Sequence, residues 1–222
     1  MHEHFTRHHR RLGRTAAWAV FFLLIAYAVT LVLGLLSLES PADPIGDPYF
    51  SLLELLIVVM APPMVAVMVA VHAYASPETR AYSLTALAFM TILAGITCSV
   101  HFVILTVSRQ IAAAGFPWAP LFFSFEWPSV VYALDILAWD VFFALSMLFA
   151  APVFRTGRLE KTVRVLMVAS GVLSLAGLAG VALADMGIRN IGILGYVGVS
   201  LIVFPLLGIV FGRARQASEE AG

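Results

Sequence analysis

The amino-acid sequence predicts an all-α integral membrane protein, a six-transmembrane-helix bundle with its N- and C-termini in the cytoplasm. Of its 222 residues, 61% are hydrophobic and 12% are charged, whereas a typical soluble domain carries about 25% charged residues. The mean hydropathy is +0.97. A helix needs roughly 20 apolar residues to cross a bilayer, and six stretches reach that length. They cover residues 15–38, 49–75, 81–108, 129–153, 162–184 and 190–211.

The basic residues gather in alternate connections, and this asymmetry predicts the topology. With the N-terminus inside, all lysines and arginines except Arg109 and Arg189 lie on the cytoplasmic side, as the positive-inside rule requires. We therefore expect a basic cytoplasmic segment over 1–14, a transmembrane domain over 15–212 and a cytoplasmic tail over 213–222. The only lysine is Lys161, and this preference for arginine favours a GC-rich bacterial genome. The expected location is the bacterial cytoplasmic (inner) membrane, with the lipid bilayer as the main partner.

The first apolar stretch follows a basic segment, as a signal peptide does. It is too long for a signal peptide, and no small-residue cleavage pattern follows it, so we interpret it as an uncleaved first helix. The next connection, 39–48, holds three prolines and a glycine and is a turn.

The second helix begins near Tyr49 and carries Pro62 and Pro63 in its middle. A proline removes a backbone donor and kinks a helix, and broken helices mark the binding sites of some transporters. Both prolines are therefore candidates for a gate or kink, with plain packing as the alternative.

The third helix ends near Arg109, and the fourth is expected to hold Pro128 in its first turn. The connection between them, 110–128, is rich in aromatic residues. Such a segment belongs in the membrane interface as an aromatic belt or a short interfacial helix, and it is also a candidate lid over a cavity.

The fifth and sixth helices carry almost no charge and many small residues in small-xxx-small spacing. This pattern allows close helix packing, either within the bundle or in a homo-oligomer. The members are Ser170, Ser174, Ala176, Gly177, Gly180, Ala184, Gly208 and Gly212.

Ionisable residues inside a membrane are costly and usually functional. From the outer ends of their helices, Glu54 lies about 8 Å deep, Asp135 about 10 Å deep and His101 about 12 Å deep, by the ~1.5 Å rise per residue. We therefore expect a polar pocket or proton relay at one level between the second, third and fourth helices. Its candidate members are Glu54, His101, Asp135, Asp140, Cys98, Thr97 and Arg109.

The two aspartates of the fourth helix are five residues apart, which turns them about 140° away from each other in a regular helix. One is expected to face the bundle centre and the other a neighbouring helix. The alternative is that both aspartates only lock the bundle through hydrogen bonds.

Several function classes are disfavoured by the sequence. Retinal chemistry has no lysine within the helices, and His72 lies about 25 Å from the level of His101, too far to share one haem. No metal-binding motif is present, so we expect no metal and no other cofactor. The basic cluster at 155–164 fits topology and lipid contact, so no nucleic acid is expected as a partner.

The leading expectation is a small-solute or proton-coupled transporter, with an unknown solute or the proton as its ligand. One alternative is an outward-facing metal-dependent membrane enzyme, although catalysis is the less favoured reading. A second alternative is an accessory or scaffold subunit of a membrane complex, whose polar core is purely structural.

Overall fold

The computed structural model describes residues 5–40 and 43–214, and this part of the chain is helical with short connections. Six of its helical segments are long and apolar enough to cross a membrane, as the sequence predicts. These segments are Arg7–Leu36, Tyr49–Tyr74, Pro77–Ile111, Val130–Val153, Gly157–Leu183 and Met186–Arg213. The expected terminal segments 1–14 and 213–222 lie partly outside the described residues.

Three of the six segments are single α-helices: α1 (Arg7–Leu36), α2 (Tyr49–Tyr74) and α8 (Gly157–Leu183). The third segment combines η1 (Pro77–Thr79), α3 (Arg80–Val103), the π-helical η2 (Ile104–Ser108) and α4 (Arg109–Ala113). The fourth combines α6 (Val130–Ile136), the π-helical η3 (Leu137–Phe143), α7 (Ala144–Ala150) and η4 (Ala151–Val153). The sixth combines α9 (Met186–Arg189), α10 (Ile191–Ile193), the π-helical η5 (Leu194–Val199) and α11 (Ser200–Arg213). A short helix, α5 (Ala119–Phe123), lies in the aromatic connection.

Two helix starts differ from the expectation. The first helix begins at Arg7 rather than near residue 15, because Thr6 caps it and forms a capping box with His9. The fourth segment begins at Val130, after the N-cap Ser129, whose hydroxyl accepts from the backbone N–H of Tyr132. The expectation that Pro128 occupies the first turn of that helix was therefore wrong.

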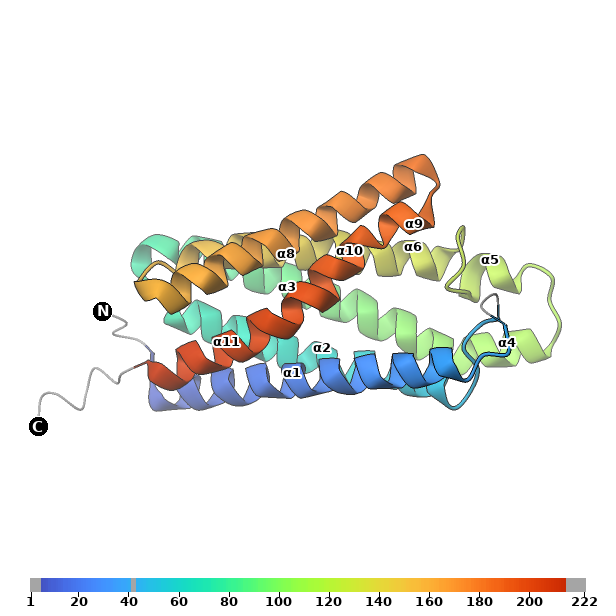
Figure 1. Ribbon diagram of the computed structural model, residues 1–222, viewed down its shortest axis with the longest axis horizontal. Coiled ribbons are helices and arrows are strands. Elements are labelled where there is room, and N and C mark those ends of the chain that lie inside the picture. The colour runs from blue at the N-terminus through green and yellow to red at the C-terminus, as the bar shows by residue number, and fades with distance from the viewer. Residues whose placement is uncertain (1–4, 41–42, 215–222) are drawn as a thin grey trace, which may run out of the picture.

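The long helices run side by side as one bundle (Figure 1). The start of α1 and the end of α11 lie at the same end of the bundle, which we call the terminal end, and α4, α5 and α9 lie toward the opposite, distal end. Aromatic rings pack together at the terminal end. The ring centroid of Phe5 lies 5.2 Å from that of Tyr74 and 5.9 Å from that of Phe211, and the Tyr74 ring stacks on the Phe154 ring at 6.0 Å. These contacts bring α1, α2 and α11 together there.

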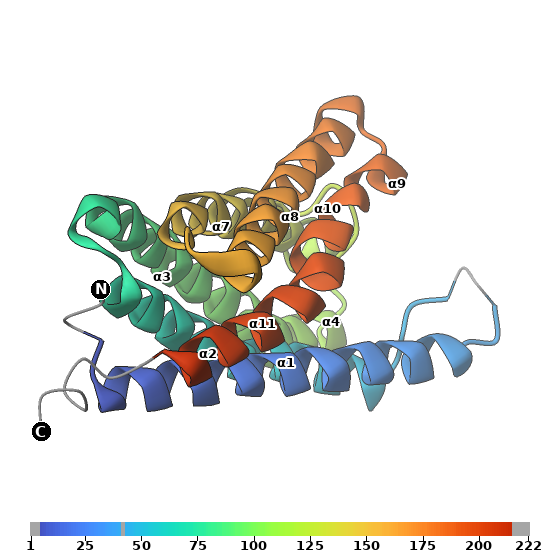
Figure 2. The same cartoon turned by 60° about the vertical axis from the view of Figure 1, so that its left-hand side comes forward.

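Toward the distal end, α1 separates from the sixth segment. It packs along α2 and α11. Beyond α11, both α9 and α10 diverge from α1, as two views show (Figures 1 and 2). The bundle is therefore closed at the terminal end and spread at the distal end.

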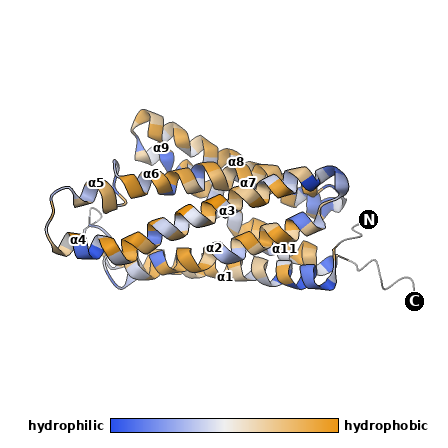
Figure 3. Cartoon of the chain, turned by 180° about the vertical axis from the view of Figure 1, so that it is seen from behind, coloured by the Kyte–Doolittle hydropathy of each residue, from blue (hydrophilic) through white to orange (hydrophobic). Residues whose placement is uncertain are grey.

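The outer faces of the helices are largely apolar, and the hydrophilic residues concentrate at the two ends (Figure 3). The exposed side chains include Phe22, Val165 and Leu183 on the long helices. An apolar surface around the middle of a helical bundle is what the hydrocarbon core of a bilayer requires. The structure is thus compatible with a multi-pass membrane protein, while the side on which each end lies remains a prediction.

The core of the terminal half is packed with methionine and large apolar side chains. Met64, Met68, Met90 and Met147 are each at most 1% exposed, and so is Phe204. Methionine fills irregular gaps between helices without polar atoms. These side chains form an apolar plug in this half of the bundle.

Candidate functional site

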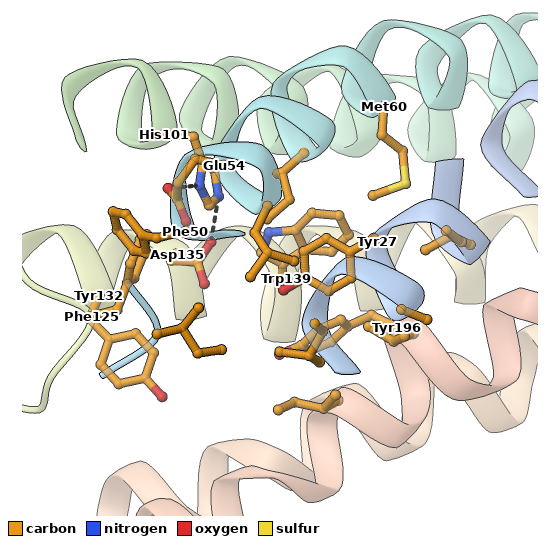
Figure 4. Close-up of a pocket in the computed structure, with 18 of the residues that line it drawn as sticks. Tyr27, Phe50, Glu54, Met60, His101, Phe125, Tyr132, Asp135, Trp139 and Tyr196 are labelled. Atoms are coloured by element: carbon orange, nitrogen blue, oxygen red, sulfur yellow. Dashed lines mark hydrogen bonds and ion pairs between the residues drawn. The ribbon is translucent and has the colours of Figure 1, made fainter. Parts of the chain in front are cut away.

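A cavity of about 380 Å³ lies in the distal half of the bundle (Figure 4). Its walls come from α1, α2, α3, α6, η3 and the sixth segment, with Phe125 from the aromatic connection. Its polar and charged lining residues are Tyr27, Glu54, His101, Tyr132, Asp135, Arg189 and Tyr196. Volumes of this size suit a small organic ligand.

One wall of the cavity carries a histidine between two carboxylates. Nδ1 of His101 lies 2.6 Å from Oε2 of Glu54, and Nε2 lies 3.4 Å from Oδ1 of Asp135. The first contact is a hydrogen bond; the second lacks hydrogen-bond geometry, and both of its atoms have no hydrogen-bond partner among the described residues. Figure 4 shows the imidazole between the two acids. His101 and Glu54 are 2% and 5% exposed, so this group is shielded from bulk water.

The three members of this group come from three different helices. Glu54 lies in the second turn of α2, His101 near the end of α3 and Asp135 near the end of α6. The ring of Phe125 lies 5.5 Å from the His101 ring and covers it from the connection. The aromatic segment therefore contributes to the cavity wall.

A second pair of charges is buried behind another wall. Nη2 of Arg189 lies 3.1 Å from Oδ2 of Asp140, and the two side chains are 4% and 0% exposed. The Arg189 guanidinium also lies over the rings of Tyr132 and Tyr196, at 5.3 Å and 5.7 Å from their centroids. Arg189 is thus held by one carboxylate and by two ring faces, which attract cations.

Glycines of α8 and of the sixth segment make room for this pair. A Cβ atom on Gly177 would lie 2.5 Å from Oδ1 of Asp140, and one on Gly192 would collide with the same oxygen. A Cβ atom on Gly180 would collide with the backbone of Arg189. Gly177 and Gly180 of the predicted motif therefore pack inside one chain, and Gly177 helps to admit a carboxylate between two helices. The homo-oligomer stays a prediction.

The two aspartates point to different neighbours. Asp135 faces His101 on α3, whereas Asp140 faces Arg189 and the glycines of α8 and α10. Asp140 itself does not line the cavity, and the π-helical turn η3 lies between Asp135 and the rest of the segment.

Three other predicted site residues do not line the cavity: Thr97, Arg109 and Cys98. Thr97 is buried, and no hydrogen-bond partner for its hydroxyl occurs within residues 5–40 and 43–214. Arg109 lies at the distal surface, where Nη2 donates to Oδ1 of Asp47 at 3.1 Å and to the hydroxyl of Ser51. Because its side chain turns to this cluster with Asp47 and Ser51, Arg109 does not line the cavity.

The thiol of Cys98 contacts a backbone carbonyl that Pro62 leaves without a helical hydrogen bond. A proline at position 62 leaves the carbonyl four residues earlier, on Val58, without its helical donor. The thiol of Cys98 makes a long contact of 3.9 Å to that carbonyl oxygen. The helix α2 continues through Pro62 and Pro63, so neither proline breaks it.

Sequence reasoning missed Arg189 as a site residue. It was assigned to an outer loop, and the sixth helix was expected to begin at residue 190. The structure places Arg189 inside the sixth membrane segment, almost fully buried. Its signal was present, because Arg189 is one of two basic residues that break the positive-inside pattern. The aromatic residues Tyr27, Tyr132, Trp139 and Tyr196 gave no comparable signal, because aromatic residues are frequent throughout this chain.

The geometry of the histidine group suits protons better than a metal ion. The two ring nitrogens of His101 point to separate carboxylates, so the three side chains do not converge on one point. Across the part of the chain that the structure describes, no group of three or more histidine, cysteine or acidic side chains is arranged to hold a metal. An imidazole between two acids can hold a proton on each nitrogen and pass it to either side.

Comparison of the chain with known protein families, with curated proteins and with solved structures finds no match.

Proposed function

We propose that this protein is a small membrane carrier in which solute binding at the distal cavity is coupled to the proton held by Glu54, His101 and Asp135. The observation that carries the proposal is the buried imidazole of His101, which faces one carboxylate with each ring nitrogen at the cavity wall. Adding or removing one proton changes the charge of this wall by one unit. A ligand that prefers one charge state is then coupled to the proton.

The other charged and titratable groups near His101 set the balance of this wall. Tyr27 from α1, Tyr132 from α6, Arg189 from α9 and Tyr196 from η5 line the same cavity. Asp140 from η3 pairs with Arg189. Arg189 therefore has a carboxylate partner of its own, whereas the two carboxylates around His101 share one imidazole.

The apolar plug of the terminal half fits one state of a carrier. A carrier opens its site to one side at a time, and the opposite side is closed by packed side chains. If the terminal end faces the cytoplasm, as the arginine distribution predicts, this state is the outward-facing one. Passage would then require helix movement at the plug.

The test uses purified protein in liposomes that enclose a pH-sensitive dye. Solutes from four classes, which are cations, anions, zwitterions and neutral compounds, are added outside one at a time. We expect at least one class to drive proton movement with wild-type protein, and we expect Asp135→Asn and Glu54→Gln to lose it. Glu126→Gln is the matched control, because it makes the same chemical change at an exposed acid outside the cavity.

Two results would contradict the proposal. One is proton movement that persists unchanged in Asp135→Asn and Glu54→Gln. The other is no proton movement for any of the four classes with folded wild-type protein, which would favour a structural role for the polar core.

A further inference from the structure

The cavity carries more negative than positive charge around the ligand space. Glu54 and Asp135 both face His101, which contributes at most one positive charge. The charge of Arg189 is already opposed by Asp140 at 3.1 Å. With both carboxylates ionised, one carboxylate charge remains even when the imidazole is protonated. In a low-dielectric site, such a surplus attracts a cation and repels an anion.

Asp135 is the acid best placed to meet a ligand. The side chain of Asp135 is 14% exposed, whereas that of Glu54 is 6% exposed. The contact of Asp135 to His101 is also the longer of the two, and it lacks hydrogen-bond geometry. The carboxylate of Asp135 is therefore more available than that of Glu54 to pair with a ligand.

Aromatic rings form much of the remaining wall. Tyr27, Phe125 and Trp139 line the cavity, and the Trp139 ring lies 5.4 Å from that of Tyr196. Ring faces attract organic cations, and in this structure Tyr132 and Tyr196 already hold the guanidinium of Arg189. The walls therefore suit a cation that also carries apolar groups.

Both α1 and the sixth segment also contribute apolar side chains to the cavity. Leu24, Ala28 and Leu31 of α1 line it, and so do Ile193 and Val197 of the sixth segment. These helices diverge toward the distal end (Figure 2). A ligand that approaches from the bilayer would pass between apolar side chains before it meets Asp135.

We infer that the cavity binds a lipophilic organic cation, such as a quaternary ammonium or phosphonium ion with apolar substituents, which reaches it from the bilayer between α1 and α10. The positive charge lies against Asp135, and the substituents pack on the aromatic rings. This inference rests on the proposed function, because it names the solute class of the same cavity.

The test measures binding rather than transport, with wild-type protein in nanodiscs of zwitterionic lipid. Equilibrium dialysis compares labelled tetraphenylphosphonium with tetraphenylborate, which has nearly the same shape and the opposite charge, and with tetramethylammonium, which lacks the apolar rings. Empty nanodiscs give the background from lipid partitioning. We expect saturable binding of tetraphenylphosphonium and none of tetraphenylborate. Tetramethylammonium is expected to bind at least about tenfold more weakly.

Variants locate the binding. Asp135→Asn is expected to weaken tetraphenylphosphonium binding by roughly tenfold or more, and Glu126→Gln is expected to leave it unchanged. Trp139→Leu is expected to weaken it, whereas Trp139→Phe, which keeps a ring, is expected to retain most of it.

The outcomes separate this inference from the carrier proposal. Equal binding of the two tetraphenyl ions, preference for the anion, or an unchanged affinity in Asp135→Asn would overturn the inference. If, in addition, an anion or a neutral solute drives proton movement in the liposome assay, the carrier proposal stands with another solute class. Cation binding without any proton movement would support the inference and contradict the coupling.

Discussion

Oε2 of Glu54 lies 2.6 Å from Nδ1 of His101, and both side chains are almost completely buried although 47 residues separate them in the chain. This contact joins α2 to α3 and holds the imidazole toward Asp135. It is therefore a structural tie and a part of the candidate site at once.

Replacing Glu54 separates these two roles. Glu54→Leu leaves a buried ring nitrogen without its partner, and we expect a loss of about 1–3 kcal/mol in stability. Glu54→Gln keeps an oxygen that accepts the hydrogen bond, so its loss should be smaller. Unfolding in mixed detergent micelles, followed by tryptophan fluorescence, measures both. Equal losses in the two variants would show that the hydrogen bond contributes little.

The buried pair of Asp140 and Arg189 is expected to couple strongly. Removing one partner leaves an uncompensated charge, which costs about 3–5 kcal/mol, whereas apolar replacement of both is often nearly neutral. We expect Asp140→Leu and Arg189→Met each to lower the unfolding midpoint markedly, and the double variant to recover much of the loss. A double-mutant cycle measures this coupling. Additive losses would contradict it.

The glycines around Asp140 offer a matched test of packing. A Cβ atom on Gly192 would collide with the Asp140 carboxylate, while one on Gly198, in η5, meets nothing within 4 Å. We therefore expect Gly192→Ala to lower thermal stability and Gly198→Ala to leave it unchanged or raise it slightly, because alanine favours helices. Melting in detergent compares the two directly. A similar effect of both substitutions would show that α10 can move away from Asp140.

The distal surface cluster should depend on pH. The hydrogen bond from Ser51, together with the Arg109 guanidinium, holds the pKa of Asp47 below its ordinary value of 3.8. A carboxyl with a lowered pKa stabilises the folded state above its ordinary value, and this contribution is lost as pH falls through the lowered one. The pair is exposed, so its contribution is small, within about 1 kcal/mol.

We expect the melting temperature of Asp47→Asn to lie slightly below that of the wild type at pH 7. The difference should shrink as the pH falls below 3.8 and vanish below the lowered pKa of Asp47. Glu39→Gln, an exposed acid of the same connection, is the control. A difference that stays constant over this range would exclude the carboxylate as its source.

Much of the fold could be predicted from the sequence, because lipid imposes a strong and local pattern. Twenty apolar residues in a row specify a membrane helix whatever their order, so all six segments were found. The ends were harder: Thr6 starts α1 within a basic stretch, and Ser129 rather than Pro128 starts α6. Caps of this kind depend on single side chains and not on average hydropathy.

The site could be predicted only in part, because depth is readable from the sequence and rotation is not. Glu54, His101 and Asp135 were expected at one level, and the structure brings them together. Arg109 was expected in the same pocket, but its side chain lies at the distal surface. Arg189 was assigned to a loop because its pairing with Asp140, 49 residues earlier, leaves no local pattern in the sequence.

The pairing of Asp140 with Arg189 has a consequence for biosynthesis. If the segments enter a membrane in the order of synthesis, the carboxylate of the fourth arrives there before the cation of the sixth. An isolated charge is unfavourable in lipid. We therefore expect the newly made segment to stay with the insertion machinery, or in contact with water, until Arg189 arrives. Chains that stop after α8 would keep an orphaned acid, which makes them candidates for recognition and degradation by membrane quality control.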